Sequence, residues 1–111
     1  MISEINLVDG CEGWWVDTGV SRHVCNDRSF FKTYYVAEGR KVLLGDSTGK
    51  VELRFTSGKT MILKDVMHAQ AIRKNLISGF LLNKAGFTQT IGADTYIFTK
   101  NGVFVGKGIC Y

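Results

Sequence analysis

The fold is constrained most by short segments in which apolar and polar residues alternate and which end at glycine-containing turns. Residues 51–56 are the clearest case, because every second residue is apolar and charged residues lie between them. A period of two residues is typical of a strand with one buried face. Ser57-Gly58 then predicts a turn and residues 60–66 a second strand, so that the two strands form a hairpin.

Further strands are predicted on both sides of this hairpin. Residues 96–98 and 103–105 flank Lys100-Asn101-Gly102. Asn-Gly between two apolar runs is a strong hairpin signal, because both residues tolerate positive φ. Residues 14–16 and 41–44 are short apolar runs that each end at a turn, which predicts two more strands.

One helix is predicted late in the chain. Ser78 can cap its start, Phe80-Leu81-Leu82 and Ala85 supply its apolar face, and Gly86 ends it. Many short strands with a single helix predict an all-β chain that folds as a small closed barrel.

Length and composition fit one globular domain over residues 1–111, in which residues 1–13 can form a loose N-terminal lead. Of the 111 residues, 45% are hydrophobic and 22% are charged, as in ordinary globular domains. No apolar run is long enough to span a membrane, and residues 1–10 lack the basic start and apolar stretch of a secretory signal. The three cysteines follow no recognised spacing, and an odd number favours free thiols in the cytosol.

The net charge of +4 does not by itself indicate a nucleic-acid-binding face. Such a face would cluster its basic residues, whereas those between residues 22 and 41 are interspersed with Asp27 and Glu38. A solvated surface is the favoured interpretation, and a weak patch for polyanions is the alternative.

His23 and Cys25 alternate as in a strand, and a zinc site needs four ligands in paired spacing. Core packing is therefore favoured for them, and no metal or other cofactor is expected.

The candidate functional motif is Asp17-Thr18-Gly19, which directly follows the apolar run at residues 14–16. An apolar strand followed by Asp-Thr/Ser-Gly is the pattern of the active-site turn of aspartic proteases. That chemistry needs an Asp at a strand end, a hydroxyl that can bond across a two-fold axis, and a Gly that lets the backbone approach the carboxylate. Two such carboxylates held close together share a proton, so that one acts as base on a water and the other as acid. The alternative is that Asp17 opens an ordinary turn.

A second segment, residues 75–86, runs from an apolar strand through Ile77, Ser78 and Gly79 into the predicted helix. It is similar to the strand-to-helix passage that packs beneath the catalytic turn in retroviral-type proteases. A generic strand–helix corner is the alternative. Both signals nevertheless occur in the expected order within one short chain.

These motifs resemble the protease region of plant copia-type retrotransposon Gag-Pol polyproteins, and the resemblance covers nearly the whole chain. It implies a closed retropepsin-like barrel that acts as a homodimer on a peptide or polyprotein substrate, within the cytoplasm and in a virus-like particle. Nucleic acid would be bound only by neighbouring polyprotein domains. By the same resemblance Asp17 is the catalytic residue, and Thr18 and Gly19 are its supporting turn. The matching segments are residues 14–19, 21–25, 55–60, 72–79, 81–87 and 99–108.

Three departures from the family pattern bear on activity. The residue after the motif is Val20, where the family usually has alanine, and no proline occurs near Ala69-Gln70, which leaves that turn less rigid. The family is longer at residues 45–51, the region expected to form the flap that closes over substrate. The chain keeps only a flap remnant there, made up of Gly45, Asp46, Ser47, Thr48 and Gly49.

Two functions therefore stay open. The first is an aspartic endopeptidase that cleaves its own polyprotein. The second is a catalytically impaired or repurposed interaction module that keeps the barrel, which the short flap and Val20 favour. Because a loop at residues 45–51 is too short to cover a peptide, we expect cleavage to be weak or absent and to improve when a longer loop is grafted there.

Overall fold

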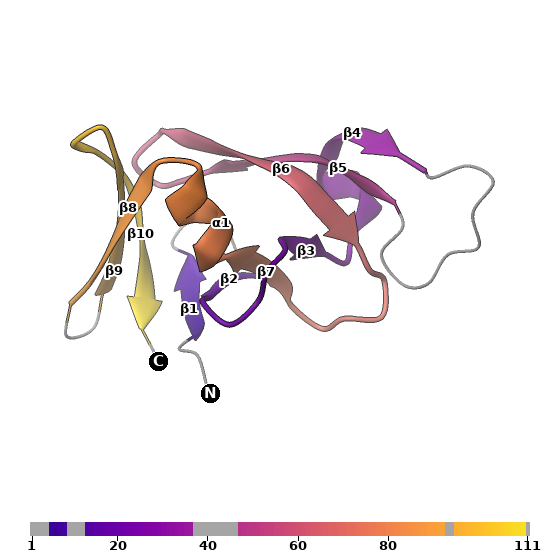
Figure 1. The fold of residues 1–111 in the computed structure, drawn as a ribbon, viewed down its shortest axis with the longest axis horizontal. Coiled ribbons are helices and arrows are strands. Elements are labelled where there is room, and N and C mark those ends of the chain that lie inside the picture. Colours follow the sequence, from indigo (N-terminus) through magenta and orange to yellow (C-terminus); the bar gives the residue numbers. More distant parts are fainter. Residues whose placement is uncertain (1–4, 9–12, 37–46, 93–94, 111) are drawn as a thin grey trace.

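The computed structural model describes residues 5–8, 13–36, 47–92 and 95–110 (Figure 1). In these ranges no helix is long and apolar enough to cross a membrane. The elements, in chain order, are β1 (Ile5–Val8), β2 (Trp14–Asp17), β3 (Val24–Cys25), the 3-10 turn η1 (Arg28–Phe30), β4 (Phe31–Tyr35), β5 (Thr48–Arg54), β6 (Thr60–His68), β7 (Asn75–Ser78), α1 (Gly79–Lys84), β8 (Phe87–Ile91), β9 (Thr95–Lys100) and β10 (Val103–Cys110).

The described strands form a single 10-stranded sheet in the order β4-β5-β6-β3-β7-β2-β1-β10-β9-β8. Most neighbours are antiparallel, whereas β2 pairs with β7 and β3 with β6 in parallel. The order begins at β4 and ends at β8, and these two strands do not pair within the described residues. The prediction of an all-β chain with one short helix is confirmed, but the predicted closed barrel is not found, because no strand pairing joins the two ends.

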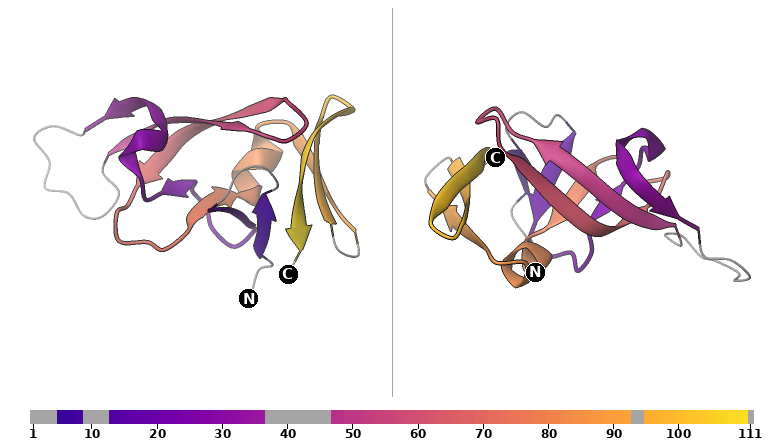
Figure 2. Two further views of the ribbon diagram at one scale, coloured as in Figure 1. Left: turned by 180° about the vertical axis from the view of Figure 1, so that it is seen from behind. Right: turned by 90° about the horizontal axis from the view of Figure 1, so that it is seen from above.

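Side-chain contacts join the β5–β6 hairpin to β10 instead. At the tip of the β5–β6 hairpin, Ser57 Oγ donates a hydrogen bond to the carbonyl oxygen of Val105 in β10 at 2.6 Å. The ring of Phe55 lies directly against Gly106, where an added Cβ would come within 2.4 Å of the ring. Figure 2 shows the hairpin crossing over toward β10. Contact between the hairpin tip and β10 therefore gives the sheet a barrel-like shape without continuous strand pairing.

The core forms because alternate strand residues point inward. The apolar face predicted for residues 51–56 is confirmed, since Val51, Leu53 and Phe55 are all buried. Full burial of an aliphatic or aromatic side chain stabilises a fold by about 1.5–3 kcal/mol. The largest fully buried side chains are those of Trp14, Tyr96, Phe98, Met61, Leu63, Ile77, Leu82, Val16, Val51 and Val66.

Both predicted hairpin turns are present. Gly58 has φ of 89° in the turn between β5 and β6. Asn101 and Gly102, between β9 and β10, have φ of 54° and 77°. These positive values explain why Asn and Gly occupy the turns, since most other residues would be strained there.

The helix begins after Ser78 as predicted, and Gly86 follows its end with φ of 96°. The predicted apolar face is wrong in part. Leu82 is buried, but Phe80 is 54% exposed and Ala85 is exposed as well. A helix of six residues makes fewer than two turns, so only one of its sides can face the core.

Within residues 1–13, the segment expected to include a loose lead, Ile5–Val8 form strand β1. This strand pairs with both β2 and β10 and so joins the two halves of the sheet. The strand predicted at residues 41–44 lies outside the described residues.

Candidate active site

Strand β2 delivers Asp17 to the edge of the core. Trp14 and Val16 are fully buried, and the alternation of the strand leaves Asp17 half-buried at its end. Asp17 pairs with Ile5 of β1 on one side and with Ser78 of β7 on the other. The carboxylate is therefore carried by a strand held on both edges, which fixes its position more firmly than a surface loop would.

The turn after β2 folds back on the carboxylate. The backbone N–H of Gly19 donates a hydrogen bond to Asp17 Oδ1 at 2.8 Å. This two-residue spacing is the geometry by which Asp commonly starts a turn. Thr18 and Gly19 are both exposed. The motif therefore places one oriented carboxylate and one exposed hydroxyl residue at the same corner of the molecule.

The passage from β7 to α1 lies directly against this turn. An added Cβ on Gly79 would come within 3.1 Å of Thr18 Cγ2, so glycine permits the close packing of the two segments. Ser78 is fully buried, and its Oγ donates to the carbonyl oxygen of Val20 at 2.8 Å and accepts from the N–H of Leu81 at 3.2 Å. We call this assembly of Asp17, Thr18 and Gly19 with Ile77, Ser78 and Gly79 the Asp17 corner.

His23 supports the Asp17 corner from inside the core. Its Nδ1 accepts a hydrogen bond from the backbone N–H of Ser78 at 2.9 Å. Burial, and secondarily the nearby charge of Arg22, lowers the pKa of His23 from 6.5 to about 4 although Asp65 acts in the opposite direction. The ring is therefore neutral at pH 7 and can accept this bond. The interpretation of His23 as a satisfied core residue is confirmed, but the sequence carried no signal for its bond to Ser78.

Beside the corner lies a cavity of about 350 Å³ lined by Thr18, Gly79, Phe80, Asn83, Gln89 and Tyr96. Gln89 Nε2 donates to the carbonyl oxygen of Gly79 and to Asn83 Oδ1, both at 2.8 Å, and the hydroxyl of Tyr96 donates to Gln89 Oε1. Gln89 and Tyr96 were missed by sequence reasoning. An isolated Gln in a strand gives no local sign that it will bond to a helix.

The predicted flap remnant has a different local structure from the one expected. The predicted loop at residues 45–51 is wrong for residues 48–51, which belong to β5. Thr48 pairs with Tyr35 of β4 and Met67 of β6. Gly49 is buried, and an added Cβ there would lie 1.8 Å from the carbonyl oxygen of Thr33.

The other residues of the predicted flap remnant are Gly45, Asp46 and Ser47. The carbonyl oxygen of Ser47 accepts from the N–H of His68 at 2.9 Å, so Ser47 is tied to β6, and Gly45 and Asp46 lie outside the described residues. Strands β4 and β5 are joined by residues 36–47.

A single chain supplies only one candidate catalytic carboxylate, whereas an aspartic protease site would need two. The sequence contains one Asp-Thr/Ser-Gly motif, so a second carboxylate would have to come from another copy. Among the described residues no group of three or more His, Cys, Asp or Glu side chains is placed to hold a metal ion. Within one chain, the corner can orient a carboxylate at a surface position where a partner can approach.

Comparison with known proteins identifies a matching family and a curated relative. The family described as "Pol polyprotein, beta-barrel domain" matches residues 14–87. The chain is 30% identical over 103 residues to the "Retrovirus-related Pol polyprotein from transposon TNT 1-94" of Nicotiana tabacum, and the aligned part covers 86% of this chain and 8% of that polyprotein. The chain thus spans less than a tenth of the length of this curated relative. No solved structure matches this chain.

Proposed function

This chain belongs to the Pol polyprotein β-barrel domain family, and on that premise we propose that it is the aspartic endopeptidase domain of a copia-type retrotransposon Pol polyprotein. The observation that carries the proposal is the packing of the β7-to-α1 passage against the Asp17-Thr18-Gly19 turn. This is the packing of the two motifs that the resemblance to retroviral-type proteases implies, and Gly79 contributes to it by leaving little room beside Thr18.

The active unit in this proposal is a homodimer with a two-fold axis through the two Asp17 corners. Two carboxylates close together cannot both ionise easily, so the pair holds one proton. The ionised Asp17 accepts a proton from a water, whose oxygen bonds to the carbonyl carbon of the peptide. The protonated Asp17 gives its proton to the carbonyl oxygen. The resulting diol then collapses: one of its hydroxyls returns a proton to the ionised Asp17, the C–N bond breaks, and the amine leaves with the proton of the other Asp17.

The described residues have specific tasks in this mechanism. The Gly19 N–H holds Asp17 Oδ1 in place, and Ser78 anchors the far side of the turn through Val20. Thr18 is exposed, and in the proposed dimer its hydroxyl would bond to the turn of the partner copy. The substrate would be an extended peptide of the polyprotein, because extended chains pair with strand edges.

The proposal is tested by Asp17→Asn in a peptide-hydrolysis assay on the dimer. Asparagine keeps an oxygen that can accept from Gly19, but it cannot serve as the base. We expect cleavage to fall by at least about a thousandfold while the thermal melting temperature stays the same or rises. The rate of the wild type should decline on both sides of an acidic-to-neutral optimum.

A matched control is Asp27→Asn. Asp27 Oδ1 accepts from the N–H of Ser29 at 2.9 Å across the same two-residue spacing, but at the start of η1. Cleavage should be unchanged in this variant. Cleavage that persists in Asp17→Asn would remove Asp17 from the mechanism. A folded wild-type dimer that cleaves no polyprotein peptide would instead favour the non-catalytic interaction module.

A further inference from the structure

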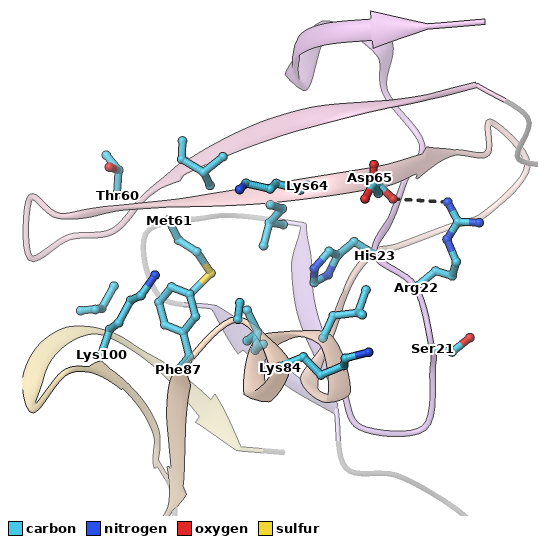
Figure 3. Close-up of a pocket in the computed structure, with 16 residues that line it drawn as sticks. Ser21, Arg22, His23, Thr60, Met61, Lys64, Asp65, Lys84, Phe87 and Lys100 are labelled. Carbon is cyan, nitrogen blue, oxygen red and sulfur yellow. Dashed lines mark hydrogen bonds between the residues drawn. The ribbon is translucent and has the colours of Figure 1, made fainter. Parts of the chain in front are cut away.

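A groove of about 800 Å³ lies between β6 and α1 and is separate from the Asp17 corner (Figure 3). Asp17, Thr18 and Gly19 do not line it. Its walls include Leu81, Leu82 and Lys84 of α1 and Ala85 directly after it, whereas the smaller cavity beside Thr18 is lined by Phe80 and Asn83 of α1. The two openings therefore lie on different sides of the helix.

One wall of the groove is an open strand edge. Residues 60–63 of β6 pair with β5 along one edge, and β3 pairs with β6 only at Met67 and His68. No strand in the described ranges pairs with the other edge of residues 60–65. Every residue of this stretch lines the groove, inward- and outward-pointing side chains alike. Side chains on opposite faces of a strand are expected to line the same opening when that opening lies along the edge of the strand.

The floor of the groove is apolar. Met61 and Leu63 from β6, Leu82 from α1 and Val105 from β10 are buried in it, and Phe87 is half-buried at one end. These side chains come from four separate elements, β6, α1, β10 and β8, so the floor is a fixed part of the core. A ligand would gain affinity there chiefly by covering the apolar lining residues that are still partly exposed, Phe87 and Leu81.

The rim of the groove is basic. Arg22, Lys64, Lys84 and Lys100 surround the opening with Asp65 as the one carboxylate in the lining, and all five are exposed. Arg22 Nη2 donates to the carbonyl oxygen of Asp65 at 3.4 Å, so this contact leaves the Asp65 carboxylate uninvolved. The rim therefore has four positive side chains and one negative side chain and attracts an anionic partner.

We propose that this groove binds an acidic peptide segment, which adds to the open edge of β6 as an extended strand. Alternate apolar side chains of the segment pack on the floor, and the carboxylates between them lie near the lysines of the rim. The six lining residues of β6 span roughly 17 Å, which fits about five residues of extended peptide.

Two features favour a peptide over nucleic acid. Single-stranded nucleic acids bind through exposed aromatic faces on which bases stack. The aromatic ring in this groove, Phe87, already has the ammonium group of Lys100 4.8 Å from its centroid. The aliphatic floor and the open backbone edge offer groups that a peptide uses and that bases do not.

The test measures binding, not cleavage, and is done on the Asp17→Asn chain, so that failure of the proposed peptidase does not affect it. The probe is a fluorescently labelled synthetic peptide of alternating glutamate and leucine, followed by fluorescence anisotropy. Lys64→Glu, Lys84→Glu and Lys100→Glu combined should weaken binding by at least about tenfold. The matched control combines Lys50→Glu, Lys59→Glu and Lys107→Glu, which make the same change in net charge at exposed sites outside the groove. The control should change the affinity by less than about twofold, since these lysines do not line the groove and exposed charges are screened by salt.

Two further probes examine the strand addition and the choice of partner. A glutamate–leucine peptide with alternate backbone nitrogens methylated cannot donate to the edge of β6, and we expect at least about tenfold weaker binding. Equal binding of the methylated peptide, or equal losses in the groove and control variants, would overturn the proposal. A labelled single-stranded oligodeoxynucleotide that binds more tightly and displaces the peptide would overturn it as well and would assign the groove to nucleic acid.

Discussion

The Asp17 corner and the β5–β6 hairpin are stabilised in opposite ways, although both are parts of one sheet. In the corner, buried polar groups meet specific partners, as in the bond from the Ser78 N–H to His23. In the hairpin, apolar side chains alternate inward, and at Gly49 the neighbouring strand β4 leaves no room for a Cβ. Polar networks specify one geometry and are sensitive to protonation, whereas apolar packing is sensitive to volume. The two regions should therefore fail under different perturbations.

Gly49→Ala should have the largest effect on stability, and it should act on the β5–β6 hairpin. The new Cβ would lie 1.8 Å from the carbonyl oxygen of Thr33, and a backbone atom in a paired strand cannot move aside cheaply. We expect a loss of more than about 3 kcal/mol in the free energy of unfolding, measured by urea denaturation.

The control for this prediction is Gly58→Ala in the hairpin turn. Gly58 has φ of 89° and no atom within 4 Å of an added Cβ, so the variant suffers backbone strain without a clash. Its cost should be about 1 kcal/mol. Equal losses in the two variants would show that backbone freedom, and not the close approach to β4, explains Gly49.

Acidification should weaken the Asp17 corner through His23. The pKa of His23 is about 4 in the folded chain against an ordinary 6.5, so between these values the unfolded chain binds more protons. Stability from this group is therefore complete above pH 6.5 and is lost as the pH falls toward 4, by about 3 kcal/mol in total. Thermal or urea unfolding across this range measures the slope.

His23→Gln is the matched variant, because the side-chain oxygen of Gln can accept from Ser78 but does not titrate. The slope between pH 4 and 6.5 should disappear in it. Hydrogen bonds from Ser29 to Asp27 and from Lys32 to Glu52 lower the pKa values of these two carboxyls below 3.8 and 4.5, so they contribute mainly at more acidic pH. An unchanged slope in His23→Gln would assign the pH dependence to other groups.

Ser78→Ala should lower the free energy of unfolding by about 2 kcal/mol. This is less than the losses expected from Gly49→Ala and from acidification through His23. The substitution removes the cap on Leu81, which is usually worth about 1 kcal/mol, and leaves the carbonyl oxygen of Val20 without this donor. Ser21→Ala, at an exposed position two residues before His23, should be nearly neutral. If Ser78→Ala were also neutral in urea denaturation, Ser78 would not anchor the corner.

Local patterns predicted much of the fold but few of its long-range contacts. The strand at residues 51–56, both hairpin turns and the helix start followed from alternation, Asn-Gly and Ser78, because each depends on neighbouring residues. The pairing of Asp17 with Ser78 and the bond between His23 and Ser78 join residues far apart in sequence, which periodicity does not encode. The loop predicted at residues 45–51 was wrong for residues 48–51, because Gly49, a residue typical of turns, lies there where two strands pack closely.

Ser57→Ala should have the smallest effect and should sharpen the comparison at the point where the hairpin meets β10. Ser57 Oγ donates to the carbonyl oxygen of Val105 at 2.6 Å and accepts from the N–H of Lys59 at 3.2 Å. Because Ser57 is exposed, water can replace the lost hydroxyl, and the cost should be only about 0.5–1 kcal/mol. The change in local amide hydrogen exchange distinguishes the two regions better than the change in global stability does. Amide hydrogen exchange should quicken at Lys59 and remain unchanged at Leu81, since the hairpin tip loses its tie to β10 while the corner keeps all its partners. Quickened exchange at both amides would show that the hairpin tip and the Asp17 corner open together, and the two regions would then be one cooperative unit.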